Sequence, residues 1–350
     1  MLERDLAFDL HIYATGMHLL KEYGMTLKKV KELFPHVETI DASFPHTDLA
    51  STTIFGSNLM KALTKKLILR KPDLAIIHGD RPEALVTAIT CRYLNVPIAH
   101  IHGGDKTTTV DDAARHAITQ MASLHFPATK RAAQRIERMG VEKKNIHIVG
   151  ALGLDALRNA RLKSRRVLEQ IYGLPSNKKF ILVVQHPISE DVEGAGRQMS
   201  VTLQAVKNFQ LPVVLVYPNG DPGSKEMIAY IRKEEKNTNF HIFPSVDYAT
   251  FATLEKEAAV WVGNSSAGIV ESTYFKTPVV NIGPRQDGRE RSANIIDVDY
   301  DKNQIFDAIQ KSLYDKRYLQ SIQFLKSPWG DGKAAERIMK VLKHLKYGED

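Results

Sequence analysis

Short runs of apolar residues alternate along the whole chain with longer segments of amphipathic pattern. The runs are rich in valine, isoleucine and leucine, as is typical of parallel strands buried on both faces, and the longer segments are typical of helices. The segments predicted to be strands are 8–14, 73–78, 96–101, 145–149, 179–185, 212–217, 239–243, 258–262 and 278–282. The segments predicted to be helices are 50–69, 83–94, 110–122, 189–209, 266–275, 302–315 and 332–347. This alternation predicts an α/β fold built on parallel sheets.

A helix-breaking segment divides the alternation into halves of similar size. Leu174-Pro175-Ser176-Asn177 ends the helix that starts near residue 153, and a new strand follows it. A chain of 350 residues is long enough to bury two separate cores. We therefore predict two Rossmann-like domains, residues 1–172 and 173–350, and the final helix could pack on either domain, the N-terminal one included.

Polar and glycine-containing clusters follow six of the predicted strands, each at the carboxyl end. They are Gly79-Asp80-Arg81, His102-Gly103-Gly104-Asp105, His186-Pro187, Pro218-Asn219-Gly220-Asp221, Gly263-Asn264-Ser265-Ser266 and Gly283-Pro284-Arg285-Gln286. Ligands of open α/β sheets bind beyond the carboxyl ends of the strands. The positions of the clusters therefore predict one ligand cleft shared by the two domains.

The second half contains a candidate nucleotide site. Gly263–Gly268 lies between a predicted strand and a predicted helix, where free backbone N–H groups and the helix dipole favour an anion. A bound phosphate and an ordinary serine or asparagine helix cap both explain this segment. Arg285 and Arg289 could clamp a diphosphate, and Glu271 could accept hydrogen bonds from ribose hydroxyls.

Candidate acid–base groups gather in the first half. Asp80 and Arg81 follow a buried strand, where a turn and a surface cation are the alternative interpretation. Asp111 and Asp112 open the helix predicted at 110–122, so helix capping and acid–base catalysis both remain open.

Two arrangements have residue types that metals use, and neither leads us to predict a metal. His100 and His102 alternate on a strand and share a face near Asp105, but histidines at strand ends are far more often not ligands. Asp297-Val298-Asp299 resembles the metal-binding pair of some glycosyltransferases, but Asp301 continues it as an ordinary acidic turn. We expect neither a metal nor another cofactor.

The charge balance favours an anionic partner. The chain has 48 Lys and Arg against 40 Asp and Glu, a formal net charge of +8 and an isoelectric point near 9.3. The excess is spread along the chain and forms no basic stripe interleaved with aromatic residues, which argues against a nucleic-acid partner.

Cysteine usage and the N-terminus indicate the compartment. Cys91 is the only cysteine, which excludes an internal disulfide and the disulfide-framed secreted folds. The first residues show no signal-peptide pattern, and no apolar run reaches membrane-spanning length. We expect a cytoplasmic protein without a membrane partner.

Taken together, these motifs resemble those of the UDP-N-acetylglucosamine 2-epimerase family. The matching segments are Thr15-Gly16-Met17-His18-Leu19, His78-Gly79-Asp80-Arg81-Pro82-Glu83, His100-Ile101-His102-Gly103-Gly104-Asp105, Asp111-Asp112-Ala113-Ala114-Arg115-His116-Ala117-Ile118-Thr119, Tyr217-Pro218-Asn219, Gly263-Asn264-Ser265-Ser266-Ala267-Gly268-Ile269-Val270-Glu271, and Asn281-Ile282-Gly283 running to Arg285-Gln286-Asp287-Gly288-Arg289. Several ordered motifs over almost the whole chain are more specific than any one of them. The resemblance implies a GT-B-like fold, with the nucleotide held by the second domain and the sugar chemistry performed mostly by the first.

The resemblance also implies site residues. Catalytic roles carry over to Asp80, His102, Asp111 and His186. Asp105 joins this set at a position where the family usually has glutamate. Contacts with UDP carry over to Arg81, Asn219, Ser265, Ser266, Glu271 and Arg285, and Arg289 is the further candidate.

Two segments are similar to the hydrolysing branch of the family, Met17-His18-Leu19 followed by Tyr23-Gly24, and Gln185-His186-Pro187. The resemblance then implies elimination of UDP from UDP-N-acetylglucosamine through a glycal, and water addition that gives an N-acetylmannosamine-type sugar. Because no carbonyl acidifies the C2–H bond, this elimination depends on stabilising the departing diphosphate. Such an enzyme fits sialic acid biosynthesis, and we expect a homo-oligomer, a dimer or a tetramer.

Two departures from the family pattern leave alternatives open. Thr107-Thr108-Thr109 replaces a loop that often holds glycine or glutamate, so a diacetamido-trideoxy sugar nucleotide is an alternative substrate. Family members begin with an extra strand and a Gly-Thr-Arg turn, whereas this chain starts inside the first helix, so we expect a truncated or misassigned start. The alternative functions are a GT-B-type glycosyltransferase, a non-hydrolysing epimerase and a catalytically silent UDP-sugar-binding protein.

Overall fold

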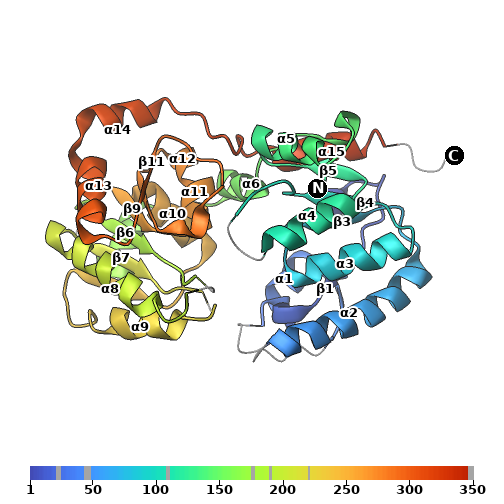
Figure 1. Cartoon of the computed structure of the whole chain (residues 1–350), viewed down its shortest axis with the longest axis horizontal. Coiled ribbons are helices and arrows are strands. Elements are labelled where there is room, and N and C mark those ends of the chain that lie inside the picture. The colour runs from blue at the N-terminus through green and yellow to red at the C-terminus, as the bar shows by residue number, and fades with distance from the viewer. Residues whose placement is uncertain are drawn as a thin grey trace. The chain divides into compact units, whose positions relative to one another are not determined.

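The structure, a computed structural model, describes residues 1–20, 25–42, 49–107, 111–174, 178–188, 191–219 and 221–345. It divides into two compact units whose elements are labelled in Figure 1. The first unit consists of Met1–Val149 together with Ala334–Asp350, and the second unit is Gly150–Lys333. None of the helices within the described ranges combines the length and the apolar character that crossing a membrane requires.

The first unit contains two parallel sheets. A three-stranded sheet has the order β3 (Ala75–His78), β4 (Ile98–Ile101) and β5 (Leu124–Phe126), and a two-stranded sheet pairs β1 (Tyr13–Ala14) with β2 (Glu38–Thr39). Its helices are α1 (Leu27–Leu33), α2 (Leu49–Arg70), α3 (Pro82–Tyr93), α4 (Asp111–Met121), α5 (Lys130–Arg138) and α15 (Ala334–Leu342). All four residues of β4 are buried, three of them apolar and the fourth His100.

The core of the first unit depends on one stripe of α2. Apolar residues four positions apart fall on the same side of a helix, and this stripe is fully buried. Its members are Phe55, Leu59, Leu63 and Leu67. They pack in one cluster with Ile77 of β3 and Ile98 of β4, which fixes α2 against the three-stranded sheet.

The second unit is built on a six-stranded parallel sheet. The strand order is β11 (Ile295–Val298), β10 (Val279–Ile282), β9 (Val260–Gly263), β6 (Ile181–Val184), β7 (Val213–Val216) and β8 (Phe240–Phe243). The chain order reverses between β6 and β9, so their carboxyl ends form the switch point where ligands of such sheets bind.

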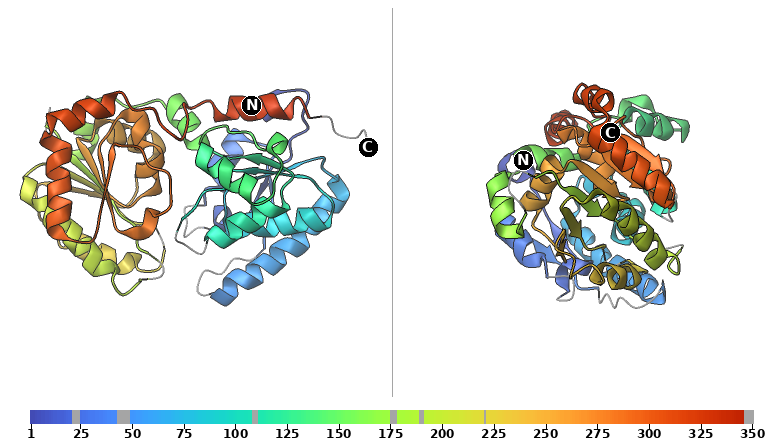
Figure 2. Two further views of the ribbon diagram at one scale, coloured as in Figure 1. Left: turned by 45° about the horizontal axis from the view of Figure 1, so that its top comes forward. Right: turned by 90° about the vertical axis from the view of Figure 1, so that its left-hand side faces the viewer.

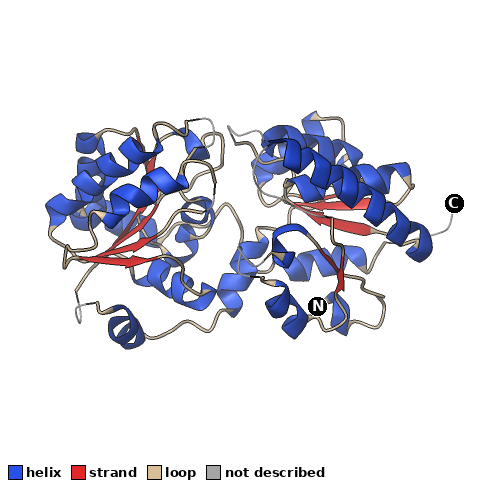
Figure 3. Ribbon diagram, turned by 90° about the horizontal axis from the view of Figure 1, so that it is seen from below, coloured by secondary structure: helices blue, strands red, loops and turns tan. Residues whose placement is uncertain are grey.

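Helices cover both faces of this sheet (Figures 2 and 3). The helices of this unit are α6 (Leu152–Asn159), α7 (Arg165–Tyr172), α8 (Ala195–Val206), α9 (Ser224–Arg232), α10 (Tyr248–Glu257), α11 (Ser266–Val270), α12 (Ser272–Phe275), α13 (Lys302–Tyr314) and α14 (Lys316–Gln323). Successive residues of β6 join different cores: Ile181 and Val183 pack in one cluster, whereas Leu182 packs in the other. This alternation over two buried faces explains why the strand has an unbroken apolar sequence.

The predicted α/β class is confirmed, but the strand list needed correction. Residues 145–149 form no strand, since Ile146 makes only an isolated bridge with His125 of β5. Only Tyr13–Ala14 of the segment 8–14 is a strand. The strands β2, β5 and β11 were missed because β2 and β5 are very short, and β11 is an edge strand whose residues are all partly or fully exposed.

The two compact units divide the chain near residue 150, whereas the predicted domains were 1–172 and 173–350 with the final helix left open. Residues 150–172 belong to the second unit, where Lys163 N donates a hydrogen bond to Thr253 Oγ1 at 3.0 Å. The helix breaker near Pro175 therefore lies inside that unit, between α7 and β6. The last helix, α15, belongs to the first unit, where Arg337 Nη1 donates to Val149 O at 2.9 Å.

The close approach of β6 and β9 at the switch point explains why residue 263 is glycine. Gly263 ends β9 with a φ of +138°, and a Cβ built there would lie 2.0 Å from the backbone oxygen of Val184 on β6. We predict that Gly263→Ala lowers the free energy of unfolding of the second unit by at least about 3 kcal/mol, from steric overlap added to backbone strain. Both tryptophans of the chain, Trp261 and Trp329, lie in this unit, so their fluorescence during urea unfolding is the measurement.

Gly173 is the matched control for this prediction, because it lies in the same unit. It also has a positive φ, +64°, but the nearest atom to a Cβ built there is 3.8 Å away, an ordinary contact. Gly173→Ala isolates the backbone term, which is about 1 kcal/mol. Equal unfolding midpoints for the two variants would contradict the steric explanation.

Candidate functional site

In the first unit, acidic side chains converge on a buried arginine. Arg115 of α4 is 2% exposed, and its guanidinium forms ion pairs with Asp80, directly after β3, and with Asp112 of α4. Its Nη1 also donates a hydrogen bond to Asp105 O at 3.1 Å. Burial opposes the charge, but Asp80 and Asp112 outweigh it and hold the pKa of Arg115 above its usual value. The cluster therefore keeps a fixed cation next to the Asp80 carboxylate.

His102 lies next to this cluster. It follows β4 with a φ of +65°, and its Nε2 lies 2.8 Å from Asp105 Oδ2. The Asp105 side chain is 4% exposed and that of His102 is 19% exposed, so the pair is only partly open to solvent. The ends of β3 and β4 are adjacent, since Gly79 N donates to Ile101 O at 3.0 Å. Asp80 and His102 thus leave neighbouring strands at the same edge of the sheet.

His100 does not pair with His102 as the alternation had suggested. It is fully buried, and its Nε2 lies 2.9 Å from Gly79 O. Burial lowers its pKa to about 4, so it is neutral at physiological pH. The left-handed backbone at His102 turns that residue out of the strand register, so the expectation of a shared face was wrong.

Asp111 and Arg81 are the remaining predicted site residues of the first unit. Asp111 begins α4, but its side chain lies outside the described residues. Arg81 precedes α3 with a side chain that is 58% exposed, and its Nε lies 3.4 Å from Glu83 Oε2.

In the second unit, Asn264 ties the two strands of the switch point together. Its side-chain Oδ1 accepts a hydrogen bond from His186 N at 2.7 Å, and its Nδ2 donates to His186 O at 2.9 Å. Asn264 is fully buried, and these two hydrogen bonds fix the chain after β6 against the chain after β9.

The His186 ring is held in one tautomer. Asn219 N donates a hydrogen bond to His186 Nδ1 at 3.0 Å, so the proton of the neutral ring is on Nε2. Burial, with a further contribution from the Arg285 charge, lowers the pKa of His186 to about 4. At neutral pH His186 is therefore an uncharged hydrogen-bond donor.

Cationic and hydroxyl side chains lie around the same strand ends. Arg285 Nη1 donates to Asn264 O at 3.2 Å, and Ser265 and Ser266 begin α11 directly after Asn264. Arg289 follows in the same loop, where its backbone oxygen accepts a hydrogen bond from Arg291 at 2.8 Å. The second unit thus gathers His186, Asn219, Ser265, Ser266 and Arg285 around Asn264.

Glu271 lies where α11 passes into α12. It is half-buried, and burial raises its pKa to about 7. This carboxyl group is therefore poised to gain or lose a proton near neutral pH.

Sequence reasoning missed residues that hold the others in place. Arg115 and Asn264 lie within the matched motifs, but nothing in a single sequence indicated that they would be buried partners of Asp80 and His186. Asp112, considered for capping or acid–base work, is instead a partner of Arg115. The signal that the sequence does carry is position: Asn264 directly precedes the predicted Ser265, and Arg115 lies one helical turn after Asp111 and Asp112.

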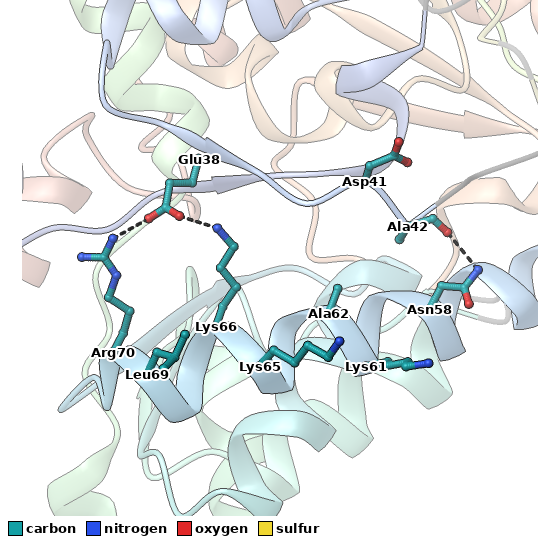
Figure 4. A pocket seen from close by; sticks show the side chains of 10 residues that line it. All are labelled: Glu38, Asp41, Ala42, Asn58, Lys61, Ala62, Lys65, Lys66, Leu69 and Arg70. Carbon is teal, nitrogen blue, oxygen red and sulfur yellow. Dashed lines mark hydrogen bonds and ion pairs between the residues drawn. The ribbon is translucent and has the colours of Figure 1, made fainter.

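A separate groove of the first unit lies away from these residues. A groove of about 670 Å³ runs along α2 and is lined by Glu38, Asp41, Ala42, Asn58, Lys61, Ala62, Lys65, Lys66, Leu69 and Arg70 (Figure 4). Glu38 pairs there with Lys66 and, at 2.9 Å, with Arg70. None of the predicted site residues lines this groove, and we assign it no part in the site.

Removing the buried cation of the first unit should be costly. Arg115→Ala is predicted to lower the free energy of unfolding by about 3 kcal/mol, because Asp80 and Asp112 lose their buried partner. Far-UV circular dichroism during urea unfolding is the measurement, since both tryptophans report on the second unit. Arg131→Ala, at an exposed position of α5, is the control and should change stability by no more than about 0.5 kcal/mol. A loss of similar size in both variants contradicts this assignment.

Comparisons with known proteins agree with the motifs. The sequence model of the UDP-N-acetylglucosamine 2-epimerase family matches residues 1–343. A UDP-N,N'-diacetylbacillosamine 2-epimerase (hydrolyzing) from Legionella pneumophila is 33% identical over 345 residues, which are 98% of this chain and 90% of that protein. A UDP-N-acetylglucosamine 2-epimerase from Neisseria meningitidis is 33% identical over 318 residues, which are 89% of this chain and 81% of that protein.

Solved structures show the same fold. A UDP-GlcNAc 2-epimerase from Neisseria meningitidis, crystallised with UDP-GlcNAc, has a TM-score of 0.84 at 19% identity over 98% of this chain and 94% of that one. The enzyme from Methanocaldococcus jannaschii, crystallised with UDP-GlcNAc and UDP, has a TM-score of 0.77 at 21% identity over 98% of this chain and 94% of that one. The predicted GT-B-like class of two Rossmann-like domains is confirmed.

The ordered motifs, a family match over nearly the whole chain and two relatives at one-third identity agree with the resemblance seen in the sequence. The chain therefore belongs to the UDP-N-acetylglucosamine 2-epimerase family.

Proposed function

We propose that this chain is a hydrolysing 2-epimerase of a UDP-2-acetamido sugar. The observation that carries the proposal is the arrangement at the switch point of the second unit, where a neutral His186 held by Asn219 and Asn264 lies beside Arg285. The names of two relatives support the hydrolysing reaction, the Legionella enzyme above and one from Campylobacter jejuni, which is 31% identical over 88% of this chain.

The second unit binds UDP in this proposal. Backbone and side-chain donors of Ser265 and Ser266, with Arg285 and Arg289, hold the diphosphate. Asn219 contacts the nucleotide from the loop after β7, and Glu271 accepts hydrogen bonds from the ribose hydroxyls. The supporting observation is that the first four of these residues follow β9 and β10, next to the strand reversal where such ligands bind.

Loss of UDP requires help for the leaving group. As the bond between C1 and the diphosphate oxygen breaks, that oxygen gains negative charge. The Nε2–H of His186 and the guanidinium of Arg285 supply donors for this charge without having to reorganise. A neutral donor suits this step because the proton on Nε2 does not depend on pH near 7.

The first unit acts on the sugar. A carboxylate takes the proton from C2, the C1–O bond breaks, and a C1=C2 double bond forms in the resulting glycal. Water then adds its hydroxyl to C1, while C2 receives a proton on the opposite face. We assign this work to Asp80 and Asp111, with the His102–Asp105 pair positioning the sugar and Arg81 contacting the UDP. Arg115 supports it by holding the Asp80 side chain in place through their ion pair.

Two substrates follow from this proposal, and the same experiment compares them. UDP-N-acetylglucosamine is the substrate named in the family description, and a diacetamido-trideoxy UDP-sugar is the one named for the Legionella relative. The homo-oligomer, the cytoplasmic location, the link to sialic acid synthesis and the action of both units on one substrate molecule stay predictions.

Incubation with each UDP-sugar alone, in deuterated water and followed by NMR, tests the function. We expect release of UDP and a free 2-epimeric sugar with deuterium at C2, because the C2 proton is exchanged during elimination. UDP release only when an acceptor sugar is added would indicate a glycosyltransferase instead. Tight binding without any turnover would indicate a UDP-sugar-binding protein.

A further inference from the structure

A second carboxyl group, that of Glu255, is buried in the same unit as Glu271. Glu255, on α10, is 0% exposed, and neither of its carboxyl oxygens has a hydrogen-bond partner among the residues that the structure describes. The helix α10 packs against α12, which Glu271 directly precedes. The charge of Glu271 contributes to raising the pKa of Glu255. The mechanism proposed above gives Glu255 no part, so its presence needs another explanation.

The surroundings of this pair contain no compensating cation within the described ranges. Of the basic residues nearby, Lys163 pairs with Asp247 at 2.8 Å, and Arg165 of α7 pairs with Glu169 at 3.1 Å. The remaining basic residues nearby are Lys256, Arg161 and Arg166, which are exposed, Arg158 of α6, which donates to Gly332 O at 3.3 Å, and Lys276 after α12, which donates to Leu325 O. An ionised Glu255 would therefore be buried without a partner, which costs several kcal/mol.

The other titratable residues of these helices include two tyrosines and one acid of α6. Tyr248 begins α10 and donates to Gly153 O at 3.4 Å, and Tyr274 is the titratable residue of α12. A Cβ built at Gly153 would lie 3.6 Å from Glu271 Oε1, so the first turn of α6 lies against this carboxyl. Asp155 is the acidic residue of α6. Glu271, unlike Glu255, is partly exposed and can meet a ligand.

We propose that Glu255 and Glu271 form a carboxyl pair in which Glu255 stays protonated, and that nucleotide binding at Glu271 expels one proton from the protein. The proposal rests on the proposed function, since it takes Glu271 as the acceptor of the ribose hydroxyls. A carboxylate accepts two hydroxyl hydrogen bonds, whereas a protonated carboxyl keeps one oxygen occupied as a donor. Ribose therefore binds the ionised form of Glu271 in preference to the protonated form.

The pH dependence of nucleotide affinity follows from the protonation of Glu271 and Glu255. Burial raises the pKa of Glu271 to about 7, and burial together with the charge of Glu271 raises the pKa of Glu255 well above its usual range. Below pH 7 the free protein carries a proton on Glu271 that binding must expel, so affinity falls as pH falls. Above pH 7 Glu271 is already ionised in the free protein, so binding releases almost no proton and affinity levels off.

The test uses UDP-glucose and the full chain. This ligand lacks the 2-acetamido group, its diphosphate diester has no ionisation near neutral pH, and free UDP is followed to detect turnover. Calorimetric titrations in two buffers of different ionisation enthalpy count the protons released. We expect about one proton released per ligand at pH 6 and almost none at pH 8, with a dissociation constant about tenfold higher at pH 6. The 2′,3′-dideoxyuridine counterpart should bind more weakly and without proton release.

Three variants assign the effect to its groups. Glu271→Gln should lose the proton release and bind more weakly at pH 8. Glu255→Gln should keep the proton release at pH 6 and the tenfold change in affinity, because glutamine reproduces the neutral form in which Glu255 stays. Glu257→Gln, a half-buried position on the same helix, is the matched control and should follow the unmodified protein.

The outcomes separate the two proposals. If UDP-glucose binds at no pH, the proposed function itself fails. If it binds with a dissociation constant that does not change between pH 6 and pH 8 and releases no proton, only the carboxyl pair is overturned. Loss of the proton release in Glu255→Gln also overturns it, since Glu255 and not Glu271 would then be the group that titrates.

Discussion

Asp80→Asn is expected to lower kcat for hydrolysis of the UDP-sugar by at least about a hundredfold, the lower range for loss of a general base. Asparagine keeps the shape of the side chain beside Arg115 but cannot take a proton from C2. The affinity for UDP should change little, because in the proposal the nucleotide is held by the second unit. Initial rates of UDP release and the dissociation constant of UDP, measured on the same preparation, give the two quantities.

The control for this variant is Asp73→Asn. Asp73 is exposed and precedes β3, the same strand that Asp80 follows, so its loss should leave kcat within about twofold. Deuterium incorporation at C2 adds a second check, since it should fall together with kcat. A rate for Asp80→Asn within tenfold of the unmodified enzyme would remove Asp80 from the chemistry.

His186→Ala is expected to lower kcat by at least about a hundredfold, because loss of one positioned donor to a developing charge costs about 3–4 kcal/mol. The same change leaves Asn219 N without its acceptor, so the loop after β7 also loses an anchor. Because the pKa of His186 is lowered to about 4, its neutral donor form persists throughout pH 5–8. Protonation of His186 should therefore produce no step in the rate profile within that range.

His241 gives the comparison for this variant. It is a half-buried histidine of the same sheet, on β8 at the far edge from the strand reversal, and His241→Ala should retain most of the activity. A step in kcat near pH 6.5 that disappears in His186→Ala would show that His186 works as a charged acid, which contradicts the neutral-donor assignment. Equal losses in the two histidine variants would indicate a structural cause.

Most of the second unit could be predicted because its strands are buried on both faces. Runs such as Ile181–Val184 and Val260–Gly263 have an apolar residue at almost every position, a pattern that a single sequence displays directly. The first unit was harder to predict. Its strands β1 and β2 have two residues each, too few for any period to be recognised.

The candidate site was predicted in the same uneven way. Residues that follow strands, such as Asp80, His102 and His186, were identified because loops at strand ends carry unusual polar residues. The sequence assigned no role to Arg115 or Asn264. In the structure Arg115 is the buried partner of Asp80, and Asn264 is the buried partner of His186. Burial depends on what the rest of the chain packs against a side chain, and no local pattern reports it.

The sequence by itself determined the α/β class, the family and the places where polar clusters meet strand ends, because these follow from local periodicity and from motifs in fixed order. Only the tertiary structure decided where the two units divide, near residue 150. It also decided that His186 is a neutral hydrogen-bond donor and that the Glu255 carboxyl group is fully buried. These properties depend on which distant segments exclude water from a group. Exclusion of water sets both the strength of hydrogen bonds and the preferred protonation state of each side chain.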